Sequence, residues 1–412
     1  YIRVDLTRLR RTVNPRAEWR QMFDENGRLM ASHYWREDMN GVDWDSVLNR
    51  YRPLVDLCHV VDDLHDILWE TVAELNTSHS YVSASGAAGD SDMRAGLLGA
   101  DVSSGNDGAK VVRVIPGESS DPRAWSPLRA AGVAVTEGDV IVAVDGRKVG
   151  ADGNLGELLE GSAGRVVELT VRRGENERQV AVVPMADEAP LRYHDWVASR
   201  RRYVEEHSGG RLGYLHVPDM VSDGWAELHR QIGEATRHEG VIADVRFNHG
   251  GHTSQLVVER LARRVVGWDY SRWYATADTY PQNAVRGPIV MVTNQWAGSD
   301  GDIVAAATQA MGYAKVIGER SWGGVVGIDG RFDLVDGTSV TQPRYAGWYG
   351  SYGWGVENHG VDPDIVVTVS PEDWEADRDV QLDAAIAECL RQLDDKPAAT
   401  APELPGPAFD RC

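Results

Sequence analysis

The feature that most constrains the fold is an alternation of strand-like and helix-like segments between about residues 191 and 393. Apolar, β-branched runs such as RLGYLHV, GVIADV and GPIVMVT alternate with segments such as WAELHRQIGEATR, whose apolar residues recur at helical spacing. This alternation predicts a largely parallel sheet with helices packed against it. The segment QLDAAIAECLRQL predicts a closing helix.

Two segments of different character precede this region. Residues 17–82 carry apolar residues at three- and four-residue spacing, which predicts a helical bundle with Asp43 and Asp45 able to cap one helix. From about Arg94 to Pro184, short β-type runs alternate with glycine turns. We therefore expect a mixed α and β, multidomain chain. Its parts are a strand lead-in (YIRVDL) and helical bundle at 1–85, a β domain at 90–187, an α/β domain at 188–395 and a flexible Pro/Ala-rich tail at 396–412.

Composition narrows the class of protein. A chain of 412 residues is too long for one ordinary core, and its net charge of −21 argues against nucleic acid as a partner. No apolar run approaches the roughly 20 residues of a membrane helix. The three cysteines, Cys58, Cys389 and Cys412, form neither a disulfide framework nor a zinc pattern, which favours the cytoplasm. The chain starts without Met, and we expect it to be part of a longer protein.

The segment WSPLRAAGVAVTEGDVIVAVDGRKV strongly resembles a PDZ domain. PDZ domains bind an extended peptide by adding it as a strand, and a glycine-rich loop receives the terminal carboxylate. GLLGAD, from Gly96 to Asp101, takes the place of that loop. The resemblance leaves open whether this groove binds peptide or whether the module is a spacer or gate.

Ser299 stands where the predicted strand GPIVMVT is followed by the predicted helix DGDIVAAATQAM. Such a junction exposes free backbone N–H groups and the positive end of the helix dipole. A serine nucleophile there would direct its oxyanion toward the N–H of Asp300. The alternative, which the local sequence alone favours, is that Ser299 only caps the helix. The stretch is not a G-x-S-x-G elbow, because Ala297 replaces the first glycine.

A Gly-Gly turn follows the strand GVIADV, in RFNHGGHTS. Glycines let a backbone N–H point outward with no side chain in the way, and in a parallel sheet this loop and the Ser299 loop lie at the same carboxyl edge. Gly250 or Gly251 is therefore a candidate second donor to an oxyanion. The sequence does not separate the two glycines, and a plain tight turn is the alternative.

His79, in NTSHSY, is the candidate general base. It closes a predicted helix within a run of small hydroxyl residues that could orient an imidazole, whereas most of the twelve histidines are expected on the surface or in packing. The spacing does not show that His79 reaches Ser299.

The order of these motifs resembles the core of the tricorn protease family across nearly the whole chain. The helical segment ends in Ser-His, a PDZ-like segment follows, and the α/β domain carries AGSDG and later VENHGVDPD. The resemblance implies a sheet of the ClpP/crotonase type and a serine peptidase that acts on oligopeptides. It implies Ser299 as nucleophile, His79 as base, Ser78 as the serine that orients the histidine, and Glu357 as the carboxylate behind it.

The resemblance also implies a homo-oligomer, a ring-shaped hexamer in that family, that needs no metal or organic cofactor. Family members that favour basic side chains before the cut use an aspartate of a neighbouring subunit. The matching segment, VVGWDYSRW, makes Asp269 the candidate, with a surface carboxylate as the alternative. The β-propeller domains and the arginine clamp for substrate ends are not recognised in this chain.

Two other functions stay open. Tail-specific C-terminal processing proteases resemble the chain in their PDZ and sheet domains, but they pair the serine with a lysine. Here Lys315 lies on the predicted strand, and RSWGG stands where that lysine is expected. The second alternative is a non-catalytic scaffold that binds peptides through the PDZ groove.

Three other groups are weaker candidates for sites. His249 and His252 favour a hydrogen-bonding role at the substrate rim over metal binding, and DPD is too short for a calcium loop. A cluster within CHVVDDLHD indicates a solvated helix face rather than a metal site; its members are His59, Asp62, Asp63 and His65.

Overall fold

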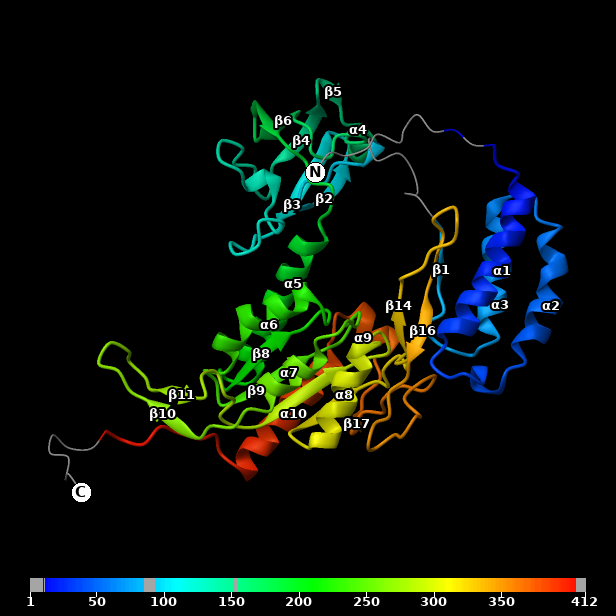
Figure 1. Cartoon of the computed structure of the whole chain (residues 1–412). Coiled ribbons are helices and arrows are strands. Elements are labelled where there is room, and N and C mark those ends of the chain that lie inside the picture. Colours follow the sequence, from blue (N-terminus) through cyan, green and yellow to red (C-terminus); the bar gives the residue numbers. More distant parts are fainter. Residues whose placement is uncertain (1–9, 11, 85–92, 151–153, 405–412) are drawn as a thin grey trace, which may run out of the picture. The chain divides into compact units, whose positions relative to one another are not determined.

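The computed structural model describes residue 10 and residues 12–84, 93–150 and 154–404. Its contacts divide the chain into two compact units, residues 1–85 with 204–412 and residues 86–203. Figure 1 labels their helices and strands. The predicted strand lead-in, YIRVDL, and the last eight residues of the predicted tail lie outside the described residues.

The N-terminal part of the first unit is the predicted helical bundle, formed by α1 (Pro15–His33), α2 (Trp44–Val55) and α3 (Val61–Ala73), with a 3-10 turn, η1 (Met39–Gly41), between the first two. Asp43 caps α2 as predicted, because its carboxylate accepts the Ser46 N–H at 3.1 Å. Helical structure ends earlier than predicted, at Ala73. The residues NTSHSY, from Asn76 to Tyr81, form an irregular turn leading into the strand β1 (Val82–Ser83).

The α/β part of the same unit contains the predicted parallel sheet, in the order β17-β13-β12-β9-β8. Its strands are β8 (Leu212–His216), β9 (Gly240–Asp244), β12 (Ile289–Thr293), β13 (Ala314–Gly318) and β17 (Ile365–Val366). Every residue of β8, β9 and β12 is buried, as expected for parallel strands covered on both faces. Because β9 and β12 are neighbours, the loops that follow them lie at one edge of the sheet.

Helices pack against this sheet. They are α6 (Ser222–Ala235), α7 (Ser254–Leu261), α8 (Asp300–Met311), the short α9 (Pro371–Glu375) and the predicted closing helix α10 (Val380–Asp395). Helix α10 packs along β8, β9, β12 and β13, whereas α7 packs against α8. The start of α8 lies beside the start of α7, since the N–H of Ser254 donates to the carboxylate of Asp300.

Short antiparallel pairs join distant segments of this unit. β1 pairs with β15 (Ser339–Val340), and β14 (Gly327–Asp329) pairs with β16 (Gln342–Tyr345). The β1–β15 pair ties the end of the helical bundle to the α/β part. It explains how a residue near position 79 reaches the carboxyl edge of the sheet.

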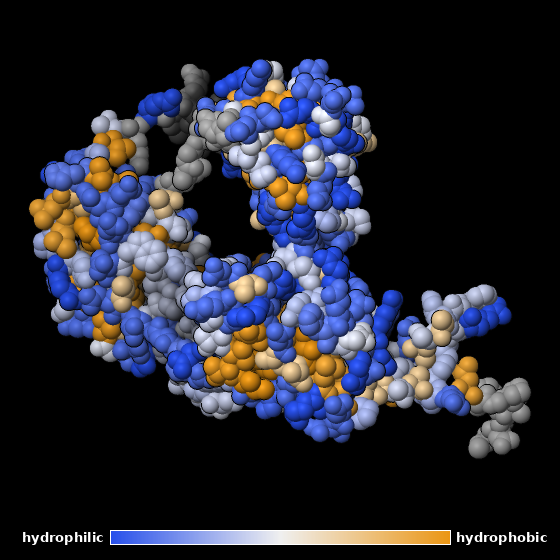
Figure 2. Space-filling model, turned by 180° about the vertical axis from the view of Figure 1, so that it is seen from behind, coloured by the Kyte–Doolittle hydropathy of each residue, from blue (hydrophilic) through white to orange (hydrophobic). Residues whose placement is uncertain are grey.

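A hairpin of β10 (Gly267–Asp269) and β11 (Asp278–Tyr280) projects from the α/β part as an arm (Figure 1). Two aromatic residues at its turn are exposed, with Trp273 75% and Tyr274 68% accessible. The face seen in Figure 2 is largely hydrophilic, with hydrophobic patches between. The described part of the predicted tail is tied to the body, since the Ala399 N–H donates to the carbonyl of Arg286 at 2.8 Å.

The second unit is an antiparallel sheet in the order β2-β3-β4-β6-β7, with β5 paired to β4. The strands are β2 (Ala100–Gly105), β3 (Gly108–Val114), β4 (Val140–Val144), β5 (Arg147–Lys148), β6 (Val167–Arg173) and β7 (Asn176–Val182). The 3-10 turn η3 (Pro127–Arg129) and the single-turn helix α4 (Leu155–Leu158) complete it, and α5 (Ala189–His207) starts in it. This is the predicted β domain. None of the helices in the described residues has the length and apolar character needed to cross a bilayer.

Candidate active site

Ser299 occupies the tight turn between β12 and α8, as the sequence predicts. Its backbone has φ 58° and ψ −120°, a conformation that non-glycine residues rarely adopt. Such strain costs of order 1–3 kcal/mol and is found mainly at functional sites. The alternative that Ser299 caps the helix through its hydroxyl is wrong, because its side chain makes no capping hydrogen bond. The hydroxyl instead lines a cavity.

The acidic residues that follow Ser299 anchor the turn. The carboxylate of Asp300 accepts the backbone N–H of Ser254 at 2.8 Å and its hydroxyl at 2.5 Å, which ties the start of α8 to the start of α7. The carboxylate of Asp302 accepts the Ser321 hydroxyl at 2.5 Å and the N–H groups of Gly323 and Gly324 at 2.8 and 3.2 Å. Burial raises the pKa of Asp302 to about 6. The Asp-Gly-Asp sequence thus fixes the Ser299 turn to two other segments.

The Gly-Gly turn after β9 packs directly against Ser299. A Cβ on Gly250 would lie 2.5 Å from the Cβ of Ser299, so only glycine fits there. The Gly250 N–H donates to the side-chain oxygen of Asn248 at 2.9 Å and is therefore occupied. Within the described part of the chain, the N–H groups of Gly251 and Asp300 have no acceptor. Two unoccupied donors thus come from neighbouring loops beside Ser299.

His79, just before β1, is held by Thr341, which directly follows β15. The hydroxyl of Thr341 donates to the His79 carbonyl at 2.7 Å and accepts the N–H of Tyr81, also at 2.7 Å. His79 is 6% exposed, and its imidazole lies edge-on to the ring of Trp322, with 5.3 Å between ring centroids. Burial lowers the pKa of His79, while the nearby Glu357 carboxylate opposes that shift. The net lowering of the pKa favours the neutral imidazole, the form that accepts a proton.

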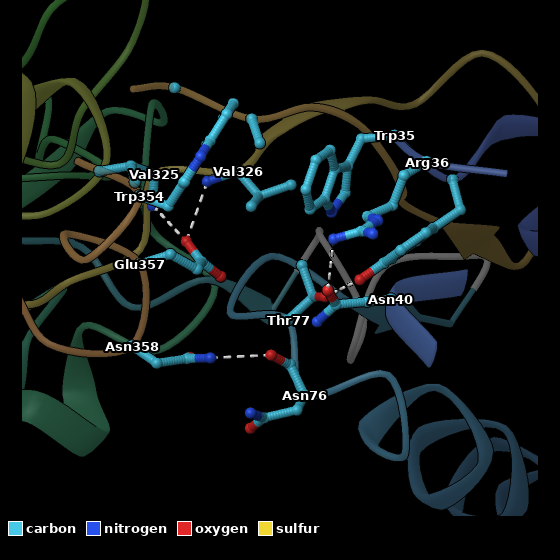
Figure 3. A pocket seen from close by; sticks show the side chains of 13 residues that line it. Trp35, Arg36, Asn40, Asn76, Thr77, Val325, Val326, Trp354, Glu357 and Asn358 are labelled. Carbon is cyan, nitrogen blue, oxygen red and sulfur yellow. Dashed lines mark hydrogen bonds between the residues drawn. The ribbon is translucent and has the colours of Figure 1, made fainter. Parts of the chain in front are cut away.

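Ser78 and Glu357 lie behind the imidazole. The Ser78 hydroxyl is 3.3 Å from Nδ1 of His79. Glu357 accepts the backbone N–H of Ser78 at 2.8 Å on one oxygen, and the N–H groups of Val325 and Val326 at 2.7 and 3.0 Å on the other. The hydrogen bond between Ser78 and the carboxylate thus comes from the peptide group of the serine. In Figure 3 this carboxylate faces a second cavity, of about 550 Å³, lined by Trp35, Trp354 and other residues.

One cavity of about 480 Å³ brings together the residues predicted from distant parts of the sequence. His79, Gly251 and Ser299 line it. The remaining lining residues are Tyr81, Asn248, His249, His252, Gln295, Trp296, Gly298, Trp322 and Ile328. The arrangement contains a hydroxyl, a neutral imidazole and unoccupied N–H groups, which are the parts that acyl transfer requires.

Two predicted residues lie elsewhere. Asp269 is on the arm, exposed, and does not line this cavity. The ammonium of Lys315 pairs with the Asp364 carboxylate at 3.3 Å, with its side chain about half exposed, and does not line the cavity either.

Sequence reasoning missed four residues that build the site. Asn248, Ser321, Trp322 and Thr341 act through tertiary contacts, and none belongs to a local pattern with a recognisable spacing. The segment RSWGG contains Ser321 and Trp322, but in the sequence it was interpreted only as a place where the lysine of C-terminal processing proteases is absent.

Comparison with known proteins gives a consistent picture. Residues 211–367 match the model of peptidase family S41, residues 96–187 the tricorn protease PDZ domain, and residues 15–73 the tricorn protease C1 domain. Over 98% of its length the chain is 60% identical to tricorn protease homolog 1 of Streptomyces coelicolor, covering 38% of that protein. Over 91% of its length it is 38% identical to the tricorn protease of Thermoplasma acidophilum, covering 35% of it.

The crystal structure of the tricorn protease superposes with a TM-score of 0.90 and 36% identity, over 95% of this chain and 38% of that one. The chain thus spans little more than a third of the length of these relatives.

Proposed function

The chain belongs to the tricorn-type peptidases of family S41, and from that membership we propose that it is a serine peptidase that hydrolyses oligopeptides. Ser299 is the nucleophile and His79 its general base. The observation that carries the proposal is that these two residues, 220 positions apart in the sequence, line one cavity.

In the proposed reaction, Nε2 of His79 takes the proton of the Ser299 hydroxyl while Oγ attacks the carbonyl carbon of the peptide bond. The imidazolium then gives this proton to the leaving amine, and the acyl group stays on Oγ. A water molecule, activated by the same imidazole, releases the acid product and restores the serine. A positioned base of this kind contributes about 10²–10⁴-fold to the rate.

Ser78 and Glu357 orient and stabilise the base. With its proton on Nδ1, His79 donates to the Ser78 hydroxyl at 3.3 Å and leaves Nε2 free to accept from Ser299. Glu357 favours the positive imidazolium through its charge and holds the peptide group of Ser78. The role of this carboxylate is therefore electrostatic and structural rather than a direct contact with the imidazole.

The backbone N–H groups of Asp300 and Gly251 form the proposed oxyanion hole. Their lack of an acceptor within the described residues supports this choice, whereas the Gly250 N–H is occupied by Asn248. Gly250 instead provides the space in which the Ser299 turn packs. Donors fixed in advance at the position where charge develops typically lower the barrier by several kcal/mol.

The substrate and assembly follow the family. We expect a homo-oligomer, hexameric by resemblance, in which the arm of one subunit brings Asp269 to the site of its neighbour and favours basic side chains before the cut. The exposed aromatic residues Trp273 and Tyr274 on that arm fit a surface that is covered in an assembly. We also expect a cytoplasmic location, since Cys58 and Cys389 are free thiols.

Two alternatives are less well supported. A C-terminal processing protease would need a lysine beside Ser299, and Lys315 is engaged with Asp364 at an exposed position. A purely binding scaffold would have no use for a strained serine turn beside a buried imidazole.

The test is the hydrolysis of short fluorogenic peptides by the Ser299→Ala variant. We expect kcat/KM to fall by at least about 10³-fold with the thermal melting curve unchanged. The exposed Ser351→Ala, on a loop outside the cavity, is the matched control and should retain full activity. Wild-type turnover in Ser299→Ala would refute the proposal.

A further inference from the structure

The loop of the second unit that resembles a PDZ carboxylate-binding loop is already occupied by the chain itself. The N–H of Gly99 donates to the Glu188 carboxylate at 2.7 Å. The N–H of Gly96 donates to the Leu159 carbonyl and that of Leu97 to the Met185 carbonyl, each at 2.8 Å. In a PDZ domain, backbone N–H groups of this loop receive the terminal carboxylate of the ligand.

The glycines of the loop are also closely packed by other parts of the unit. A Cβ on Gly96 would lie 2.2 Å from the Ser162 hydroxyl and 2.5 Å from Pro184, so these groups leave no space for a side chain at this position. A Cβ on Gly99, where φ is +64°, would meet the side chain of Leu191 at 2.9 Å. Leu191 belongs to the first turn of α5 and is fully buried with Ile115.

Glu188 and Leu191 together supply the chemistry of a peptide C-terminus, which offers one carboxylate and one apolar side chain. The charge of Glu188 is balanced by Arg192, whose guanidinium donates to it at 2.7 Å and to Asp101 at 2.9 Å. One guanidinium thus serves two carboxylates. The Asp101 carboxylate also lies 4.0 Å from the guanidinium of Arg113, which pairs with Asp195. An incoming peptide carboxylate would therefore compete with three carboxylates of the chain for these two guanidinium groups.

We propose that Glu188 is an internal ligand of this loop, and that a free peptide C-terminus binds the PDZ-like unit only by displacing the first turn of α5. In the described residues β2, next to the loop, pairs only with β3, so its other edge is open to an added strand. The open strand edge and the filled carboxylate loop together define a peptide site that is closed at one end. Displacement of Glu188 would free the start of the helix that leads into the catalytic unit.

Fluorescence anisotropy of the full chain tests this proposal. The Ser299→Ala background prevents cleavage of the probes, which are labelled hexapeptide pools ending in Leu, Val or Phe, each prepared with a free carboxylate and as the amide. We expect Glu188→Ala to bind the free-acid pools at least about tenfold tighter than the parent chain and to discriminate against the amides. Glu177→Ala, an exposed residue of β7 in the same unit, is the charge-matched control and should behave like the parent.

Glu188→Gln separates occupancy from charge repulsion. Its amide oxygen still fills the loop by accepting the Gly99 N–H, so we expect this variant to stay closed. Three results would each overturn the proposal. The first is that the parent chain binds the free-acid pools as tightly as Glu188→Ala does, and the second is that Glu188→Ala binds the acid and amide pools equally. The third is that Glu188→Gln binds the free-acid pools as tightly as Glu188→Ala does. If Glu188→Ala lowers the melting temperature of the chain, Glu188→Asp provides the same test. It keeps the negative charge, but its shorter side chain withdraws the carboxylate from the loop.

Discussion

Replacing Glu357 by glutamine removes one charge from the group behind His79 and changes little in size. The carboxylate accepts three N–H groups, from Ser78, Val325 and Val326. A glutamine has one carbonyl oxygen, so when it accepts from the two valines its NH₂ group faces the N–H of Ser78. Leaving such a donor without an acceptor costs about 1–3 kcal/mol. We expect the free energy of unfolding to fall by about that amount.

We also expect the variant to be a slower catalyst, because it no longer stabilises the imidazolium by charge and because Ser78 is free to move away from Nδ1 of His79. If the transition state loses about 1.4–2.7 kcal/mol of stabilisation in this way, kcat falls about 10- to 100-fold. Since the Glu357 carboxylate raises the pKa of His79, its removal lowers that pKa further. The acid limb of the kcat/KM profile should therefore move to lower pH.

Steady-state kinetics on a fluorogenic peptide across the pH range, with urea denaturation of the same samples, checks both effects. Glu372→Gln, at an exposed position of α9, is the control. A variant with lowered stability, wild-type kcat and an unmoved acid limb would refute the assigned role of Glu357.

Three further predictions concern the residues that hold the site. Thr341→Val loses both hydrogen bonds to the His79 segment, and we expect a roughly tenfold lower kcat, which Thr341→Ser restores because it keeps the hydroxyl. Gly250→Ala places a Cβ 2.5 Å from that of Ser299, so peptide hydrolysis should fall by about 100-fold or more even where circular dichroism finds the fold retained. Burial raises the pKa of Asp302 from 3.8 to about 6, so the ionised carboxylate disfavours the folded state. Urea denaturation should therefore find that the wild type, relative to Asp302→Asn, loses about 3 kcal/mol of stability as the pH rises from below 3.8 to 7.

The sequence predicted the sheet and the helices of the α/β part because their signals are local. Buried β-branched runs and helical spacing follow from residues close together in the chain, as in β12 and α10. The end of the helical segment was misplaced because NTSHSY forms a turn that leads to Val82, the first residue of β1, which pairs with β15; no local pattern reports this pairing. Pairing between distant segments overrode helical spacing there.

The candidate site likewise has features that local sequence predicts and features that depend on tertiary contacts. The position of Ser299 at the end of a strand and the start of a helix is a local feature and was predicted. The distinction between Gly250 and Gly251 depends on the side chain of Asn248, and the contact of Glu357 with the peptide group of Ser78 depends on a segment 279 residues away. Such contacts require the fold. The sequence also suggested a carboxylate loop at 96–101 without revealing that Glu188 occupies it.

The central claim is that the imidazole of His79 activates the hydroxyl of Ser299, and covalent labelling by a fluorophosphonate tests it most directly. The probe reacts only with an activated serine, and mass spectrometry of the digested protein identifies the modified residue. The account predicts a single label, on Ser299, in the wild type. It predicts no label in folded His79→Ala protein. A label on another serine, or labelling of Ser299 at an unchanged rate in His79→Ala, would contradict it.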